Sequence, residues 1–176
     1  KRKTNIKFPL ESLKEKKVIY ISMGTLLEGL EPFFNTCIDT FSDFDGIVVM
    51  AIGDRNDISK IKEAPDNFII APYVPQSEIL NEADVFITHG GMNSVHDAIH
   101  YNVPFVIIPH DKDQPMIAQR LTELEAAHRL LKEHVNVHTL KEAVTDVLSN
   151  EKYKYGIRKL NDSFLECGGS KEAIAV

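Results

Sequence analysis

Short apolar runs alternate along this chain with longer segments in which apolar residues recur every three or four positions. Short runs rich in Val, Ile and Phe are typical of strands, and the three-and-four spacing is typical of helices that bury one face. Strands are expected at residues 18–22, 46–52, 68–71, 84–88 and 103–108, with a weaker one near 129–131. Helices are expected over residues 30–41, around Ile79 and Leu80, over 95–99, over 117–124, over 139–148 and over 153–164.

This alternation predicts an α/β domain with a parallel, doubly wound, Rossmann-like sheet. The continuous apolar run at 46–52 fits a parallel strand that helices cover on both faces. With the common strand order 3-2-1-4-5-6, the loops after strands one and four flank the point where such sheets bind ligands. Thr139 and Glu142 are expected to form a capping box for one helix, and Gly168-Gly169 to end the last one.

Length and composition favour a single folded unit. The 176 residues, 43% of them hydrophobic, suffice for one well-packed domain and are too few for two large ones. Residues 1–17 are charged and contain Pro9, so they are expected to be a linker or N-terminal tail. Residues 18–176 are expected to form the domain.

The charge balance excludes some partners. A net charge of −6 argues against nucleic acid or an anionic membrane surface, because both attract a basic face. No apolar run approaches the length of about 18 residues that a transmembrane segment needs.

The two cysteines, Cys37 and Cys167, show no pairing or metal-ligand spacing, which favours a reducing, cytoplasmic location. His96 and His100 are four positions apart, but the Glu of a zinc protease motif does not follow His96, so no metal is expected.

The segment from His89 to Ser94 carries the clearest chemical signal. It joins an apolar run to an apolar-periodic segment, which predicts a strand, a glycine turn and a helix. Gly90 and Gly91 would let the backbone approach a ligand, and the first turn of a helix offers N–H groups to an anion. The alternative is that these glycines serve tight packing alone. His89 at the end of the strand favours a phosphate site, with the ring kept neutral by the positive end of the helix.

A second loop, from Ser22 to Thr25, carries a glycine and hydroxyl groups after the first strand. It is expected to meet the His89 segment in one crevice at the switch point. The G-x-G-x-x-G fingerprint of dinucleotide-binding proteins is missing here, so an NAD-type cofactor is not expected. The pattern of a P-loop is missing too.

Several short motifs together resemble the donor-binding signature of the UDP-glycosyltransferases, most closely the bacterial macrolide-type enzymes. The motifs are Tyr73-Val74-Pro75-Gln76, His89-Gly90-Gly91-Met92-Asn93-Ser94, Asp97, Val103-Pro104, Pro109 and Asp113-Gln114. The resemblance covers nearly the whole chain. It implies the C-terminal half of a GT-B fold.

The resemblance also implies a role for each matching position. Tyr73 would stack on uracil, the Val74 backbone would meet the uracil edge, and Asp97 would bind the ribose hydroxyls. Positions that would hold the diphosphate or line it are Gly24, Thr25, His89, Gly91, Asn93 and Ser94. Asp113 and Gln114 would bind the sugar hydroxyls, and Gln76 belongs to the same donor-binding set. Without the resemblance, Tyr73 would be a wall residue, and residues 111–113 a solvated loop.

The function implied is that of the UDP-sugar-binding domain of an inverting glycosyltransferase that transfers a hexose to a small-molecule acceptor. In such enzymes the general base lies in an N-terminal acceptor domain of the same polypeptide, which is expected to be absent from this chain. No catalytic residue, cofactor or metal is therefore expected here, and the isolated domain is expected to be inactive. Two alternatives stay open: half of a nucleotide-sugar epimerase, and a non-catalytic nucleotide-sugar-binding module.

Overall fold

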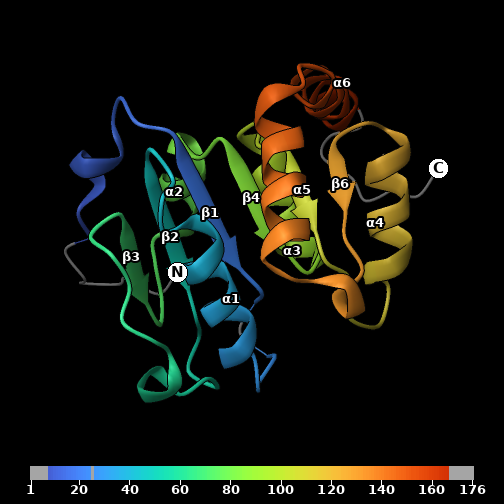
Figure 1. The fold of residues 1–176 in the computed structure, drawn as a ribbon. Coiled ribbons are helices and arrows are strands. Elements are labelled where there is room, and N and C mark those ends of the chain that lie inside the picture. Colours follow the sequence, from blue (N-terminus) through green and yellow to red (C-terminus); the bar gives the residue numbers. More distant parts are fainter. Residues whose placement is uncertain (1–7, 25, 167–176) are drawn as a thin grey trace.

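A parallel sheet runs through the part of the chain that this computed structural model describes, residues 8–24 and 26–166 (Figure 1). Its six strands lie in the order β3-β2-β1-β4-β5-β6, and every neighbouring pair is parallel. The strands are β1 (Val18–Ser22), β2 (Ile47–Ala51), β3 (Phe68–Ala71), β4 (Val85–Thr88), β5 (Phe105–Ile107) and β6 (Ala127–Arg129). The predicted fold class is confirmed, and the strands follow the common order on which the expected position of the site rested. The last strand begins slightly earlier than expected.

Helices cover both faces of the sheet. They are α1 (Glu31–Phe41), α2 (Gln76–Glu82), α3 (Met92–His100), α4 (Gln114–Glu123), α5 (Val137–Ser149) and α6 (Lys152–Glu166). Apolar residues of α1 and α5 pack on one face, where Figure 1 shows these two helices in front of the strands. Apolar residues of α2, α3, α4 and most of those of α6 pack on the other face. The elements are therefore arranged in three layers.

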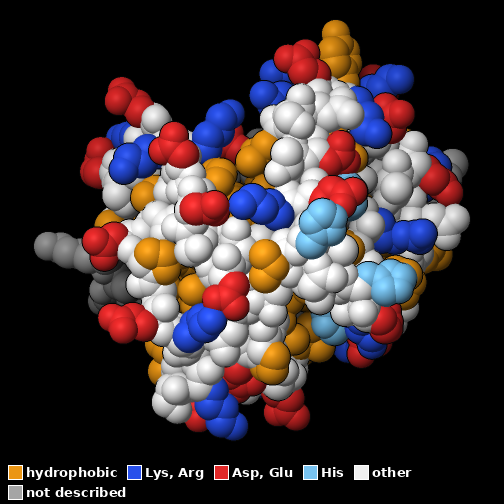
Figure 2. All heavy atoms as spheres, viewed as in Figure 1, with side chains coloured by type: hydrophobic (Ala, Val, Ile, Leu, Met, Phe, Trp, Pro, Cys, Tyr) orange, Lys and Arg blue, Asp and Glu red, His pale blue; other side chains and the backbone are white. Residues whose placement is uncertain are grey.

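The alternation of side chains along β1 explains why all five residues of this central strand are buried. Val18 and Tyr20 belong to the core on the α3 face, whereas Ile19 and Ile21 belong to the core on the α1 face. Successive side chains of a strand point to opposite faces, so a central strand covered on both sides buries all of them. The outer surface is mixed, and Figure 2 shows acidic and basic side chains interspersed over the face that carries α1 and α5.

The start of α5 corrects one expectation. The helix begins at Val137, and Asn136 rather than Thr139 is its N-cap. The Asn136 side chain accepts from the Thr139 N–H at 2.9 Å, and the Thr139 hydroxyl accepts from the Asn136 N–H at 2.9 Å. The proposed capping box of Thr139 and Glu142 was therefore wrong. Asn and Thr can both cap a helix, and the extended backbone at Asn136 (φ −153°) sets the start one turn earlier.

Part of the segment expected to be a linker is structured. Residues Leu10–Leu13 form the 3-10 helix η1, and Leu13 is only 1% exposed within the core on the α3 face. Two further 3-10 helices are η2 (Ile58–Lys60) and η3 (Lys132–His134). The expected end of α6 at Gly168-Gly169, and Cys167, lie outside the described residues. Within the described ranges, none of the helices combines the length and the apolar character needed to cross a bilayer.

The turn between α4 and β6 supports α6 through a close backbone contact. Gly156 lies in α6, and a Cβ placed there would come within 2.3 Å of the Glu125 carbonyl oxygen. Glu125 itself has a positive φ of 57°, so the chain adopts a left-handed turn without a glycine. The helix can approach this turn only because residue 156 has no side chain.

Gly156→Ala is therefore expected to destabilise the fold, although alanine ordinarily favours a helix over glycine by about 1 kcal/mol. The clash with a backbone atom forces α6 away from the turn, and overpacking of this kind costs about 1–3 kcal/mol. Urea denaturation would measure the change in the free energy of unfolding. Ser163→Ala, on the exposed side of the same helix, is the control and should change stability by less than about 0.5 kcal/mol. A stabilised Gly156→Ala variant would contradict the contact.

Candidate functional site

The loops that follow β1 and β4 meet at the carboxyl edge of the sheet. These strands are parallel neighbours, and their pairing places Ser22 opposite Thr88 at the ends of the two strands. The chain then turns at Gly24, with a positive φ of 79°, and at Gly90, with a positive φ of 93°. Glycine adopts this conformation without steric cost, which explains why both turns carry it. The predicted convergence of the two glycine loops is confirmed.

The His89 imidazole fills the space between these two loops. A Cβ on Gly24 would lie 2.8 Å from His89 Cε1, and a Cβ on Gly91 would lie 3.0 Å from the same atom. The ring is thus packed between two backbone segments that come from different βα units. The sequence indicated that glycine makes room for a ligand. In the structure, the absence of a side chain at Gly24 and at Gly91 makes room for the His89 ring.

Gly90 has a packing role. A Cβ there would lie 2.9 Å from Ile107 Cδ1 of β5, so the turn lies tightly against the neighbouring strand. Its N–H points to the Thr88 hydroxyl at 3.4 Å. Both paired glycines are thus required for packing, Gly90 against Ile107 of β5 and Gly91 against the His89 ring.

His89 is neutral near pH 7. Burial lowers the pKa of its imidazole to about 4; the neighbouring His110 lowers it further, and Asp111 opposes the shift. The expected neutral state is thus supported, with burial as its main cause rather than the end of the helix. The Thr88 hydroxyl lies 3.5 Å from Nδ1. A neutral imidazole carries one N–H, which can donate to an anion without itself bearing charge.

The N-terminus of α3 opens next to this ring. Gly91 is its N-cap and provides no capping side chain, and the first intrahelical bond runs from the Val95 N–H to the Gly91 carbonyl at 3.0 Å. The N–H groups of the preceding helical residues are left for a ligand or water. Asn93 is exposed, and Ser94 is half-buried. Four of the predicted diphosphate-binding residues therefore lie together at this helix end, namely His89, Gly91, Asn93 and Ser94.

Gln76 and Asp97 are also brought together. The Gln76 Nε2 donates to Asp97 Oδ2 at 2.9 Å, and the Gln76 Oε1 accepts from the Tyr20 hydroxyl at 2.9 Å. Tyr20 was not among the predicted site residues. The available signal was a tyrosine between two isoleucines in a buried strand, since a buried phenol requires a hydrogen-bond partner.

Tyr73 and Val74 lie in the segment after β3. The Tyr73 hydroxyl donates to the Asp54 carboxylate in the segment after β2, which holds the half-buried ring from its polar end. Asp54 was also missed, because nothing local links it to Tyr73. Val74 packs partly buried against the core on the α3 face.

The loop from His110 to Gln114 gives its two predicted residues different surroundings. Asp113 is exposed at the start of α4, as a residue that contacts a ligand would be. Gln114 is only 8% exposed, and its Oε1 accepts from the N–H groups of His110 at 2.9 Å and Asp111 at 3.3 Å. Its amide oxygen therefore shapes the loop. Thr25, the remaining predicted residue, lies outside the described residues.

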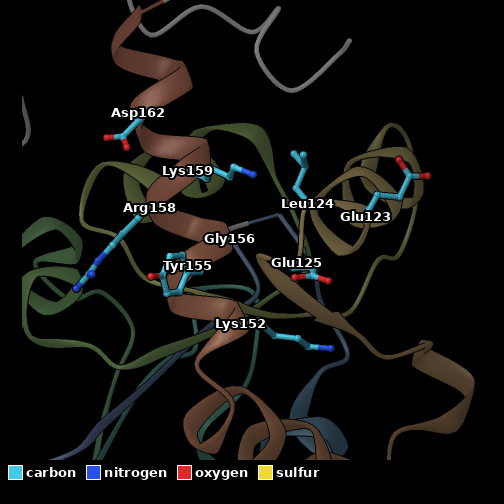
Figure 3. A pocket seen from close by; sticks show the side chains of 9 residues that line it. All are labelled: Glu123, Leu124, Glu125, Lys152, Tyr155, Gly156, Arg158, Lys159 and Asp162. Atoms are coloured by element: carbon cyan, nitrogen blue, oxygen red, sulfur yellow. The ribbon is translucent and has the colours of Figure 1, made fainter.

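The structure also contains a cavity that is separate from these residues. It has a volume of about 830 Å³ and lies between the turn after α4 and one side of α6 (Figure 3). Glu125, Lys152 and Lys159 are among its lining residues, so it carries charges of both signs. None of the predicted donor-binding residues lines it. Within residues 8–24 and 26–166, no group of three or more His, Cys, Asp or Glu side chains could hold a metal ion.

Comparisons with known proteins agree with the fold. The family model of the C-terminal domain of erythromycin biosynthesis protein CIII-like proteins matches residues 35–173. The Bacillus subtilis protein named "Uncharacterized UDP-glucosyltransferase YdhE" is 58% identical over 174 residues, covering 99% of this chain and 44% of that protein. The Bacillus subtilis NDP-glycosyltransferase YjiC is 37% identical over 161 residues, covering 92% of this chain and 41% of that protein.

A solved structure, that of the glycotransferase of kitacinnamycin, has a TM-score of 0.83 at 30% identity and covers 99% of this chain and 45% of its own. The fold and these likenesses define a domain of the GT-B glycosyltransferase class. More narrowly, the chain belongs to the family of C-terminal domains like that of erythromycin biosynthesis protein CIII. It spans less than half the length of the curated relatives it matches.

The His89 side chain should titrate with a midpoint near pH 4 in an NMR experiment, because burial disfavours its charged form. An unfolded histidine titrates near about 6.5. Between these values the unfolded chain binds a proton that the folded chain does not, so this residue should lower stability as pH falls from 6.5 to 4. His89→Gln should remove that part of the pH dependence, measured as the difference between the two unfolding profiles. A midpoint near 6.5 would contradict the burial of the ring.

Proposed function

We propose that this chain binds the UDP-hexose donor of an inverting glycosyltransferase. The observation that carries the proposal is the position of the neutral His89 ring between Gly24 and Gly91, beside the N-terminus of α3. A helix N-terminus and a neutral N–H donor together suit a diphosphate. Relatives named as UDP- and NDP-glycosyltransferases support this choice over an epimerase.

The remaining predicted residues extend the proposed site in two directions from the diphosphate. On the nucleoside side, Tyr73 offers an aromatic face, and Asp97 offers a carboxylate that accepts hydrogen bonds from ribose hydroxyls. On the sugar side, the exposed Asp113 offers a second carboxylate. Gln114 acts mainly by holding the loop that carries Asp113, since its amide oxygen binds two N–H groups of that loop.

In this proposal the chain contributes positioning and charge stabilisation to the reaction. When the glycosidic bond to the donor phosphate breaks, negative charge develops on the departing UDP. Donors placed beforehand around the diphosphate stabilise that charge without reorganising during the step. The small-molecule acceptor and the base that deprotonates it would be held by an N-terminal domain of the same polypeptide. Attack from that side displaces UDP with inversion at the anomeric carbon.

Isothermal titration calorimetry with UDP and with uridine tests the proposal. UDP should bind the chain more tightly than uridine, because only UDP reaches His89 and the end of α3. His89→Ala should weaken UDP by about 1.5–3 kcal/mol, the range for a hydrogen bond to a charged group, and should leave uridine nearly unchanged.

His89→Gln keeps a donor nearby and should lose less affinity than His89→Ala. His138→Ala is the matched control, since that histidine is 87% exposed on α5 and should not affect either ligand. Absence of UDP binding would refute the proposed function. Equal weakening of UDP and uridine by His89→Ala would instead show that the ring lies at the wrong end of the nucleotide.

A further inference from the structure

The hydroxyl of Tyr20 is placed where packing alone does not need one. Tyr20 lies in the central strand β1 and is 1% exposed. Its ring stacks on that of Phe86 in β4, with centroids 4.7 Å apart and an interplanar angle of 13°. Phenylalanine at this position would make the same stack. Because a buried hydroxyl loses its hydrogen bonds to water, it must make hydrogen bonds within the protein instead.

Those hydrogen bonds lead from the sheet to α3. The Tyr20 hydroxyl donates to Gln76 Oε1 at the first residue of α2, and Gln76 Nε2 donates to Asp97 Oδ2 in α3, both at 2.9 Å. Three elements that are separated in sequence are connected through these side chains.

The direction of each hydrogen bond follows from the last acceptor. A carboxylate only accepts, so the NH2 end of the Gln76 amide must face Asp97. Its oxygen then faces Tyr20, which must donate. Burial raises the pKa of the Tyr20 phenol far above neutral, so the phenol keeps the proton that this arrangement needs. With the amide reversed, its oxygen would face the carboxylate and repel it.

We propose that Tyr20 is a positioning residue for recognition of the donor ribose. Its hydroxyl fixes the orientation of the Gln76 amide, the amide holds one oxygen of Asp97, and the other oxygen is presented to the ribose hydroxyls. Asp97 is half-buried, so a ligand can reach it. Tyr20 acts only through Gln76 and Asp97 and does not contact the nucleotide. This inference rests on the proposed function, because it assumes that a nucleotide occupies the crevice.

The consequence is a preference that can be measured. A carboxylate held in place to accept from hydroxyls binds a nucleotide that has them better than one that lacks them, since a partly buried acceptor is otherwise left unpaired. UDP and 2′,3′-dideoxy-UDP differ only in these hydroxyls. The ratio of their dissociation constants therefore reports how well Asp97 is positioned. Unlike overall affinity, that ratio is insensitive to a general loosening of the fold.

The experiment measures both dissociation constants by calorimetry for the full 176-residue chain and for Tyr20→Phe. The unmodified chain should prefer UDP. Tyr20→Phe should weaken UDP roughly three- to tenfold and leave 2′,3′-dideoxy-UDP nearly unchanged, so the preference should shrink by the same factor. In an Asp97→Asn background Tyr20→Phe should have no further effect on the ratio, because the two residues act in one path.

Tyr153→Phe is the matched control. Tyr153 is also buried and also donates its hydroxyl to a carboxylate, that of Asp146, but on the other face of the sheet. Removing the Tyr153 hydroxyl should leave the preference for UDP over 2′,3′-dideoxy-UDP unchanged. Gln76→Met breaks the same path at an intermediate, partly exposed position and should reduce the preference even if Tyr20→Phe folds poorly.

The outcomes separate this inference from the proposed function. If the unmodified chain binds neither nucleotide, the proposed function fails and this inference fails with it. If it binds UDP without preferring it to the dideoxy analogue, the ribose inference fails while the proposed function stands. If Tyr20→Phe or Gln76→Met weakens both nucleotides equally, the hydroxyl path is purely structural and the positioning role is refuted.

Discussion

The packing of one imidazole between two glycine backbones determines how this site is built. β1 and β4 are parallel neighbours, so the loops that follow them emerge side by side, with Ser22 opposite Thr88. A side chain at residue 24 or 91 would occupy the position of the His89 ring. The ring therefore joins two βα units at the point where the helix N-terminus of α3 opens. The contact sets both the separation of the two loops and the burial of the histidine.

Burial and charge are coupled in this arrangement. A ring between two backbones loses water, which lowers its pKa to about 4 and keeps it neutral. The positive field needed for an anion then comes from the end of α3 rather than from a charged side chain. The chain as a whole carries a net charge of −6, so binding of a diphosphate would rely on local dipoles and N–H groups. In the proposed path from Tyr20 through Gln76 to Asp97, a residue of the central strand sets the orientation of a second binding side chain, the Asp97 carboxylate.

Local sequence patterns predicted most of the fold and the meeting of the loops after β1 and β4. The strands and the loops after β1 and β4 follow from local apolar runs and glycines, whereas the strand order was taken from the common doubly wound arrangement. The patterns missed features that depend on contacts across the fold. Tyr20 hydrogen-bonds to Gln76, which lies 56 positions later in the sequence. The apolar pattern of the strand predicts only that residue 20 is buried. The buried state of Gln114 and the choice of Asn136 over Thr139 as N-cap depend likewise on backbone geometry, which residue types alone leave open.

The central claim is that the nucleotide diphosphate binds beside His89, and amide NMR during a titration with UDP tests it most directly. The account predicts that the largest shifts occur at the amides of Gly24, Gly91, Asn93 and Ser94. The amides of Glu125 and Lys159, which border the separate cavity of about 830 Å³ beside α6, should not move. Shifts concentrated around that cavity, with the glycine loops unaffected, would contradict the account.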